Sequence, residues 1–562
     1  MRSTSSSTVA CLAVLLASCS GVGTASAPAP SAGQTAARPS ATPAGGGDAV
    51  SVSRDTVYVV REVVADSAPT DVFVPLESDR LEESSLTRPA AVGETVLIER
   101  VAAIIDRPPY DQVHWGIVAK DLHDGHVLLS LNAHHTFAPA SNQKVLTGAA
   151  VLSALGPDHR FRTGVFATGP TRRGSVDGAL VLVGVGDPTW SEAFHPSWRT
   201  VFDALADSLL AQGARRFSGP LLIDASAWDT TGVPGSWMVE DVGWSWGASG
   251  GPFVVAGGQV ALTVSAAQSV GGSASVSAEP RLASGRVRVE VRSALTDSAR
   301  VQSRPPGEDG RLVVSGTVPP GWRRTLRIAQ GDPVRVAGEL LYEVLTERGI
   351  SFEGGLAFAW DAEAALVGGC AAGRVPDCPA ARRLATLTSP PLIEIVQAAL
   401  EPSDNFITDQ LAHALAQATI GRGGWRQVPE ALETELGRSF NVLSRDVEVV
   451  DGSGLSIYNL VTPRALVDVL TQMRIRPGGD RFRAALPEPG ERGSTMAGRL
   501  RSLQGRVFAK TGSLTHVNSL SGYLVRDNGR EMVFSILSNG SGLDSDEVRD
   551  AIDRLVVELA RW

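Results

Sequence analysis

Lysine is nearly absent from this chain of 562 residues. Only Lys120, Lys144 and Lys510 are lysines, so the remaining 48 of the 51 basic residues are arginines. No block of basic residues occurs, and the formal net charge is −9. This balance argues against a nucleic-acid-binding protein, which needs a concentrated basic surface. A solvated acidic surface accounts for the charge.

A membrane-spanning run is missing from the N-terminus. The apolar stretch VACLAVLLAS is too short to cross a bilayer as a mature helix, although Arg2 and a Ser/Thr run precede it as in an export signal. The stretch ends in LASC, Leu16 to Cys19, which resembles a bacterial lipoprotein signal. We therefore expect residues 1–19 to be a signal peptide and Cys19 to be lipidated, which would hold the protein at a membrane surface. The alternative is a plain secretory signal cut after Ala25–Ala27, and either way the protein is exported to the cell envelope or periplasm.

Cysteine is scarce as well, with four residues in the whole chain. Two of them belong to the signal, which leaves Cys370 and Cys378 in GGCAAGRVPDC. In an oxidising compartment we expect these two to form a structural disulfide that closes a short loop. They have no neighbouring Cys or His residues that would complete a zinc site, and we predict no metal ligands elsewhere.

The composition along the chain predicts a folded protein behind an N-terminal tether. Residues 20–49 are rich in Ala, Pro, Ser and Gly and lack large apolar residues, so we expect a flexible tether, while residues 50–92 cannot be assigned. From about residue 93, HWGIVAKDL and HVLLSLN predict two strands joined by a turn at Asp124-Gly125. KVLTGAAVLSAL then predicts a helix, and many short strand-like runs with Gly-rich breaks follow to about residue 330.

Helical patterns return in the last third of the chain. They cover DPVRVAGELLYEVLTERG and the long stretch from PPLIEIV to AQATI, which contains Ser403-Asp404-Asn405. A second strand pair is predicted around the turn DNG, and SDEVRDAIDRLVVELARW predicts a final helix capped by Asp544 or Ser545. A strand pair near each end favours one α/β domain whose halves are separated by a β-rich insertion.

The spacing of Ser141 and Lys144 suggests a serine nucleophile with a lysine as its base. If Ser141 opens a helix, a residue three positions later lies on the same face, so the lysine amine can approach the serine hydroxyl. A serine hydroxyl needs a base before it becomes a good nucleophile. Lysine can serve once burial lowers its pKa, whereas arginine does not deprotonate at any useful pH. Alone, S-x-x-K is a weak signal.

Two further motifs strengthen this signal. Ser403-Asp404-Asn405 and Lys510-Thr511-Gly512 follow in chain order, and S-x-x-K with S-D-N and K-T-G is the set found in serine β-lactamases and penicillin-binding proteins. Ser141 would form an acyl-enzyme, Lys144 would accept its proton, and Ser403 would relay a proton to the leaving amine while Asn405 holds Lys144 and the substrate.

The same set predicts where the substrate is held. The backbone N–H groups of Ser141 and Ser513 would form the oxyanion hole. Lys510, Thr511 and Ser513 would bind a substrate carboxylate, and Gly512 would let the substrate backbone lie close to the strand.

A narrower resemblance rests on PASNQKVLTGAAVLSALG, VGVGDPTW, the W-x-x-x-D stretch 237–241 and DGSGLS at 451–456. Together they resemble the D-alanyl-D-alanine carboxypeptidase/endopeptidases, the class C low-molecular-mass penicillin-binding proteins, over about residues 93–562. The resemblance implies cleavage of the terminal D-Ala, or of cross-links, in peptidoglycan stem peptides, binding of β-lactam antibiotics, and no cofactor. It also implies that Asp241 receives a side-chain amine of the substrate. Where the family often has an arginine after DGSGLS, this chain has Ile457.

The resemblance also implies the domain organisation, because the family carries two extra domains between its first two motifs. The implied fold is a β-lactamase-like transpeptidase domain, an antiparallel sheet flanked by helices, split by a large β-rich insertion. The expected catalytic halves are residues 93–163 and 392–562. The insertion, residues 164–391, would divide into a second domain, 164–190 with 285–391, and a third, 191–284.

Other interpretations remain open at this stage. The same three motifs occur in β-lactamases, although no acidic residue can be assigned here as a deacylation base. A non-catalytic peptidoglycan-binding lipoprotein is a further alternative, which the intact motifs disfavour. His123 and His126 straddle a turn and do not predict a metal site, while His413 is expected on a helix, as surface or packing. Asp451 is better explained as a turn residue at the edge of the site than as a triad acid.

Overall fold

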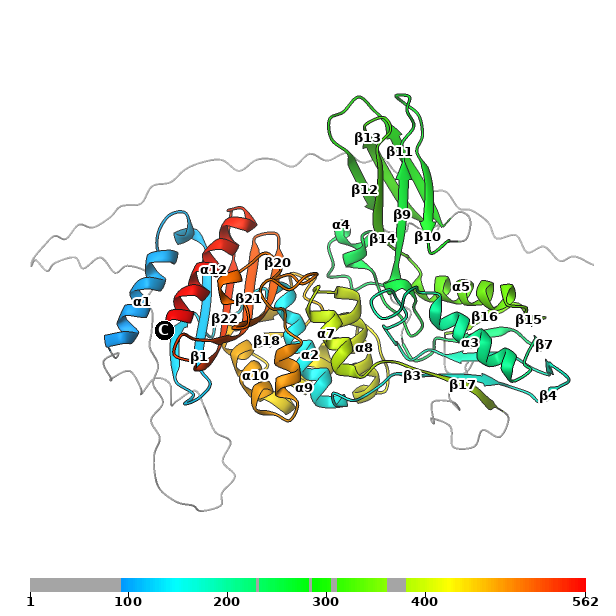
Figure 1. Ribbon diagram of the computed structural model, residues 1–562, viewed down its shortest axis with the longest axis horizontal. Helices are drawn as coiled ribbons and strands as arrows, with labels where there is room; N and C mark the ends of the chain where they lie inside the picture. The colour runs from blue at the N-terminus through cyan, green and yellow to red at the C-terminus, as the bar shows by residue number, and fades with distance from the viewer. Residues whose placement is uncertain (1–91, 229–231, 283–285, 305–310, 361–380) are drawn as a thin grey trace, which may run out of the picture. The chain divides into compact units, whose positions relative to one another are not determined.

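The computed structural model describes residues 92–562, except for 229–231, 283–285, 305–310 and 361–380 (Figure 1). The expected signal peptide, the tether, Cys19 and the Cys370–Cys378 disulfide all lie outside the described residues. Among the helices described, none is both long and apolar enough to pass through a membrane.

A five-stranded antiparallel sheet joins the two ends of the described chain. Its strand order is β2-β1-β22-β21-β20, so strands from before and after the insertion are neighbours. In particular, β1 pairs with β22 along its whole length, from His114 opposite Asn539 to Asp121 opposite Met532. The strands are β1 His114–Asp121, β2 Val127–Leu131, β20 Val507–Leu514, β21 Val517–Val525 and β22 Glu531–Asn539. The predicted fold class, one α/β domain with separated halves, is confirmed.

Both predicted hairpins are present, and glycine closes each of them. Gly125 and Gly529 have φ values of 75° and 79°, the left-handed conformation that tight hairpin turns require and that glycine adopts without steric cost. These turns set the register that places alternate side chains on the two faces of the sheet.

One face of the sheet is covered by the first and last helices described, α1 Val92–Ile105 and α12 Ser545–Arg561 (Figure 1). The helix α12 begins after Asp544, whose carboxylate accepts the N–H of Asp546. Its predicted apolar stripe is buried against the sheet and α1: Val548, Ile552, Leu555, Val556 and Leu559. The stripe therefore fixes how the C-terminal helix packs.

The other face is covered by a larger helical layer. It contains α2 Gln143–Leu155, α7 Leu392–Leu400, α8 Asn405–Ile420, α9 Val428–Phe440, α10 Pro463–Ile475 and α11 Gly479–Ala484. The helix α2 contacts α7, α8, α9 and α10, and its residues 143–152 are all buried. The helix that carries Lys144 is thus the centre of this layer, and burial extends around it well beyond one apolar stripe.

The long helical pattern of residues 390–420 is interrupted at Ser403-Asp404, which corrects the expectation that this motif lies inside a helix. Ser403 has a φ of 65°, and Asp404 caps α8 by accepting the N–H of Ile407 at 2.8 Å. Proline at position 402 has no N–H to continue α7, and an aspartate two residues later is a favoured helix cap. The motif therefore lies in a tight break, with Asn405 opening the next helix.

The insertion contains a first core built on two mixed sheets, β16-β8-β6-β3-β17 and β15-β7-β5-β4, with α3 Thr200–Ala211 and α5 Pro333–Glu347. Its strands are β3 Arg162–Ala167, β4 Thr171–Arg172, β5 Ser175–Val176, β6 Leu180–Val183, β7 Arg216–Phe217, β8 Leu221–Asp224, β15 Ser351–Phe352, β16 Leu356–Ala359 and β17 Arg382–Thr388.

A second core in the insertion lies between two three-stranded sheets, β10-β9-β14 and β11-β13-β12. Their strands are β9 Gln259–Ser265, β10 Ser275–Glu279, β11 Val287–Ser293, β12 Arg300–Arg304, β13 Leu312–Val318 and β14 Arg323–Ala329. The first core draws on residues 165–255 and 334–384, whereas the second draws on 260–328. These cores favour boundaries near 258 and 330, which differ from the expected 191–284. We propose this division of the insertion in its place.

Short elements complete the described chain. They are the helix α4 Val239–Val242, the strands β18 Val447–Glu448 and β19 Leu460–Val461, and the 3₁₀ helices Tyr110–Gln112, Ala140–Asn142, Ser245–Gly247, Ala256–Gly258 and Arg501–Leu503.

Candidate active site

Ser141 and Lys144 meet at the start of α2. Ser141 lies in the 3₁₀ helix Ala140–Asn142 and is half-buried, and Ala140 before it has a φ of 49°. The left-handed region is costly for a residue with a Cβ, so the neighbouring loops must hold this turn in place. Lys144 is fully buried on the first turn of α2, and its Nζ donates to Ser141 Oγ at 3.0 Å. The three-residue spacing therefore brings the hydroxyl and the amine into contact.

The Lys144 amine has two further acceptors, which come from distant segments. Its Nζ donates to Asn405 Oδ1 and to the carbonyl of Ser453, each at 2.6 Å. Burial lowers the pKa of Lys144 from 10.5 to about 8. Three carboxylates oppose this shift, those of Asp409, Asp451 and Asp404. With a pKa near 8, about a tenth of the lysine is neutral at pH 7 and able to accept a proton.

Asn405 is positioned by contacts at both ends of its amide. As the first residue of α8 it presents Oδ1 to Lys144, while its Nδ2 donates to the carbonyl of Trp246 at 2.8 Å. Ser403 lies two residues earlier in the break between α7 and α8 and is half-buried. The break thus brings the second motif to the site from the start of a helix.

The third motif lies on β20, the edge strand of the sheet. Lys510 is fully buried and donates to the carbonyl of Thr511 at 2.8 Å. Burial lowers the pKa of Lys510 well below its ordinary value, and the nearby Lys144 lowers it further. Thr511 Oγ1 donates to Thr495 Oγ1 at 2.7 Å, and the exposed Ser513 donates to Asn518 Oδ1 at 3.0 Å. The amines of Lys144 and Lys510 thus lie within electrostatic reach of one another.

Gly512 has a structural role beside the one that its motif predicts. A Cβ at this position would lie 2.9 Å from both the carbonyl of Pro139 and the N–H nitrogen of Ser141, and would also strike Ser519 Oγ. The space that the glycine leaves is therefore filled by the turn that carries Ser141. Glycine here lets β20 approach that turn closely.

Asn142, to which sequence reasoning gave no role, ties the same turn to the sheet. It is fully buried, and its Nδ2 donates to the carbonyl of Lys510 at 3.1 Å and to Ser519 Oγ at 2.6 Å. Ser519 Oγ in turn donates to the carbonyl of Pro139 at 2.8 Å. Since the Asn142–Lys510 contact spans 368 positions, no local pattern signals it.

Asp451 organises the DGSGLS loop through its own carboxylate. It is fully buried and accepts the N–H groups of Gly454 and Ser456, each at 2.7 Å, and the indole N–H of Trp237 at 2.8 Å. The carbonyl that Lys144 contacts belongs to Ser453 in the middle of this loop. These bonds support the interpretation of Asp451 as a turn residue that shapes the edge of the site.

His413 is a packing residue of α8. Its ring lies 4.5 Å from that of Trp228 and 4.4 Å from that of Trp425, measured between ring centroids. Burial lowers the pKa of His413 to about 3, so the imidazole is neutral at physiological pH. Within the described ranges, no three or more His, Cys, Asp and Glu side chains gather where they could hold a metal ion.

Asp241 reaches the site through Trp246. It lies on α4, and its Oδ1 accepts the indole N–H of Trp246 at 2.8 Å. The backbone carbonyl of the same tryptophan accepts from Asn405, so the insertion borders the second motif directly. Ile457 and Tyr458, which follow the DGSGLS loop, are large apolar side chains left exposed.

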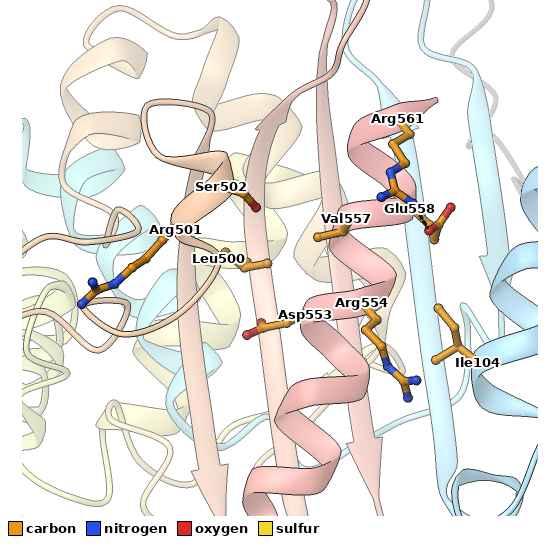
Figure 2. A pocket seen from close by; sticks show the side chains of 9 residues that line it. All are labelled: Ile104, Leu500, Arg501, Ser502, Asp553, Arg554, Val557, Glu558 and Arg561. Carbon is orange, nitrogen blue, oxygen red and sulfur yellow. Dashed lines mark hydrogen bonds and ion pairs between the residues drawn. The ribbon is translucent and has the colours of Figure 1, made fainter.

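A separate pocket of about 530 Å³ lies on the opposite, α1–α12 face of the sheet (Figure 2). Charged side chains of α12 line it, but several are already paired: Asp553 with Arg499, and Glu558 with Arg100 and Arg561. None of the predicted site residues contributes to its wall.

The family model of the D-Ala-D-Ala carboxypeptidase 3 (S13) peptidases matches residues 97–561. The chain belongs to this family. Among its relatives, the D-alanyl-D-alanine carboxypeptidase of Actinomadura sp. (strain R39) is 33% identical over 484 residues, which cover 83% of this chain and 85% of the relative. This S13 chain is therefore a peptidase, and the family predicted from its motifs is confirmed.

Solved structures show that the fold of this S13 peptidase is shared. Penicillin-binding protein 4 (dacB) of Haemophilus influenzae superimposes with a TM-score of 0.68 at 22% identity, covering 84% of this chain and 98% of that protein. The same protein in complex with a novel β-lactam gives a TM-score of 0.65 at 22% identity, covering 84% and 100%. The predicted penicillin-binding-protein fold with an insertion is thus confirmed.

Proposed function

We propose that this S13 peptidase is a serine-type D-Ala-D-Ala carboxypeptidase that acts on peptidoglycan stem peptides through an acyl-enzyme on Ser141. One observation carries the proposal: a fully buried lysine with a pKa near 8 contacts the hydroxyl of a half-buried serine at 3.0 Å. A serine hydroxyl paired with an amine that can lose its proton is an activated nucleophile.

In the first step, Ser141 Oγ attacks the carbonyl carbon of the penultimate D-Ala, and its proton passes to the neutral amine of Lys144. Asn405 Oδ1 and the Ser453 carbonyl both accept from Lys144 Nζ, so they stabilise the ammonium that forms. The C–N bond to the terminal D-Ala then breaks, and Ser403 relays a proton to the leaving amine. Water hydrolyses the ester and restores Ser141.

The substrate is held by groups of β20 and of the insertion. The N–H groups of Ser141 and Ser513 form the oxyanion hole, and Lys510, Thr511 and Ser513 bind the terminal carboxylate. Asp241, whose carboxylate accepts the indole N–H of Trp246, receives an amine of the stem peptide. No cofactor is needed for these steps.

The same acyl transfer gives the peptidase two further properties within this proposal. A cross-link whose acyl donor is D-Ala is cleaved by the same steps, which is DD-endopeptidase activity. A β-lactam acylates Ser141 in place of the peptide, an expectation that the β-lactam complex of the H. influenzae protein supports. The family match favours the peptidase over a β-lactamase and over a non-catalytic binding protein.

The cell envelope is the proposed location. The similarity to a penicillin-binding protein of H. influenzae supports an envelope function. We further propose a lipid anchor on Cys19 and a disulfide between Cys370 and Cys378. Loss of palmitate incorporation and of membrane association in Cys19→Ser tests the anchor, and retention of both would contradict it.

Peptide and penicillin substrates together test the function. We expect the purified protein to release D-Ala from a D-Ala-D-Ala-terminated stem peptide and to be labelled stably by a fluorescent penicillin, with Ser141→Ala losing both. Rapid penicillin turnover without peptide cleavage would support the β-lactamase instead. Wild-type protein that shows neither reaction would contradict both enzymatic assignments.

A further inference from the structure

In the described part of the chain Lys144 donates to two acceptors besides Ser141, and a short segment of the insertion supports both of them. These acceptors are Asn405 Oδ1 and the carbonyl of Ser453. Neither belongs to the helix that carries the lysine, so each needs support from elsewhere. The segment from Trp237 to Trp246 supplies one hydrogen bond toward each of them.

The first bond reaches Ser453 through Asp451. Trp237 is almost fully buried, and its indole N–H donates to Asp451 Oδ2 at 2.8 Å. The same carboxylate accepts the N–H groups of Gly454 and Ser456, and the Gly454 N–H belongs to the same peptide group as the Ser453 carbonyl. Fixing the carboxylate therefore fixes the direction of that carbonyl toward Lys144.

The second bond orients Asn405. The two ends of an amide side chain differ, one donating and one accepting. Because the Trp246 carbonyl accepts from Asn405 Nδ2 at 2.8 Å, the amide must turn its Oδ1 toward Lys144. The ring of Trp246 is itself held by Asp241 and stacks on Trp244 with a centroid distance of 5.4 Å, which steadies the carbonyl.

We propose that Trp237 is a positioning residue for acylation, and that through Asp451 it holds the Ser453 carbonyl on Lys144. The insertion then contributes one donor to the Asp451 carboxylate, beside the donors that the catalytic half supplies, Asn459 Nδ2 at 2.9 Å among them. The inference rests on the proposed function, since it assigns Trp237 a part in the acylation of Ser141.

The test compares two tryptophans of one cluster. Trp237 and Trp425 pack edge to face at 5.4 Å beside Leu455. Among the described residues, the indole of Trp425 donates to the carbonyl of Gly232, at 3.4 Å, and not to Asp451. Phenylalanine at either position keeps an aromatic ring and removes the N–H. Acylation by a fluorescent penicillin, resolved into its non-covalent dissociation constant and its acylation rate constant, is measured alongside thermal unfolding.

We expect Trp237→Phe to lower the acylation rate constant about tenfold, the loss typical of a hydrogen bond to a charged group, and to leave the dissociation constant unchanged. Trp425→Phe should retain the wild-type rate constant. A wild-type rate constant in Trp237→Phe would overturn the inference, because the indole donor would then be irrelevant. Equal losses in both variants would overturn it too, because the cluster would then be merely structural.

A double variant tests whether Trp237 acts through Asp451. If it does, Trp237→Phe combined with Asp451→Asn should be no slower than Asp451→Asn alone. Losses that multiply would overturn the proposed route. Wild-type protein that is not labelled would overturn the proposed function and this inference with it, whereas labelled wild type with an unaffected Trp237→Phe overturns the inference alone.

Discussion

At the scale of the residue, lysine is so rare in this chain that its positions indicate where an amine is needed. Lys144 is enclosed by three acceptors, and burial has brought its pKa to about 8. A guanidinium could donate at such a site but could not accept a proton, so arginine cannot replace it. Lys510 is equally buried, beside the same cluster.

The pKa of Lys144 predicts a pH dependence. Only the neutral amine accepts the proton of Ser141, so the acylation rate constant with penicillin should rise about tenfold from pH 6 to 7 and level off above pH 8. Stopped-flow labelling between pH 6 and 9 measures this profile. A rate that is flat over the whole range would contradict the role of Lys144 as the base.

Substitution of lysines by arginine gives a second prediction. Lys144→Arg should slow acylation about 10³-fold, because the base is lost while the positive charge is kept. Lys120→Arg, at a partly buried position of β1 outside the site, is the matched control and should stay within twofold of wild type. Comparable rates for the two variants would show that the amine is not the base.

At the scale of the element, the site depends on the close approach of β20 to the turn that carries Ser141. Three contacts support it: the Asn142 amide on the Lys510 carbonyl, the Asn142 amide on Ser519, and Ser519 on the Pro139 carbonyl. Gly512 leaves the space in which the turn lies. The position of Ser141 therefore depends on the strand as much as on its own helix.

Gly512→Ala tests this packing. The added methyl would meet the backbone at Pro139 and Ser141, so we expect at least a tenfold loss of acylation rate and a lower unfolding temperature. Gly498→Ala is the control, because a Cβ there meets nothing within 4 Å and the residue is exposed. Wild-type acylation in Gly512→Ala would refute the packing argument.

The sequence predicted the elements and the three motifs, but not the contacts between them. Strand pairs and glycine turns are local, so the hairpins of β1–β2 and β21–β22 were predictable. Helical periodicity does not reveal a break such as Ser403, although Pro402 and the cap Asp404 offered a signal. The bonds of Asn142 to Lys510 and of Trp237 to Asp451 depend on tertiary packing and left no pattern in the sequence.

At the scale of the whole molecule, the insertion separates two halves that must meet in one sheet. The β1–β22 pairing joins them, and a buried ion pair between Asp121 of β1 and Arg526 after β21 supports the junction. Both side chains are only 3% exposed, and Arg530 also pairs with Asp121 at 3.0 Å. Removing Asp121 therefore leaves the Arg526 charge buried without this partner.

Asp121→Ala should therefore destabilise the catalytic domain by about 3 kcal/mol, or about 5–10 °C in its thermal midpoint. The control is Asp480→Ala. Asp480 forms an ion pair with Arg474 at 2.8 Å, but its side chain is 88% exposed. The substitution should shift the midpoint by less than about 2 °C. Differential scanning calorimetry measures both, and equal shifts would contradict the importance of the buried pair.

The central claim is that Ser141, activated by Lys144, forms an acyl-enzyme. Peptide mapping by mass spectrometry after a brief exposure to penicillin tests it most directly. We predict one penicilloyl adduct per chain, located on Ser141, absent from Ser141→Ala and strongly reduced in Lys144→Arg. An adduct on any other residue, or one that persists in Ser141→Ala, would contradict the claim.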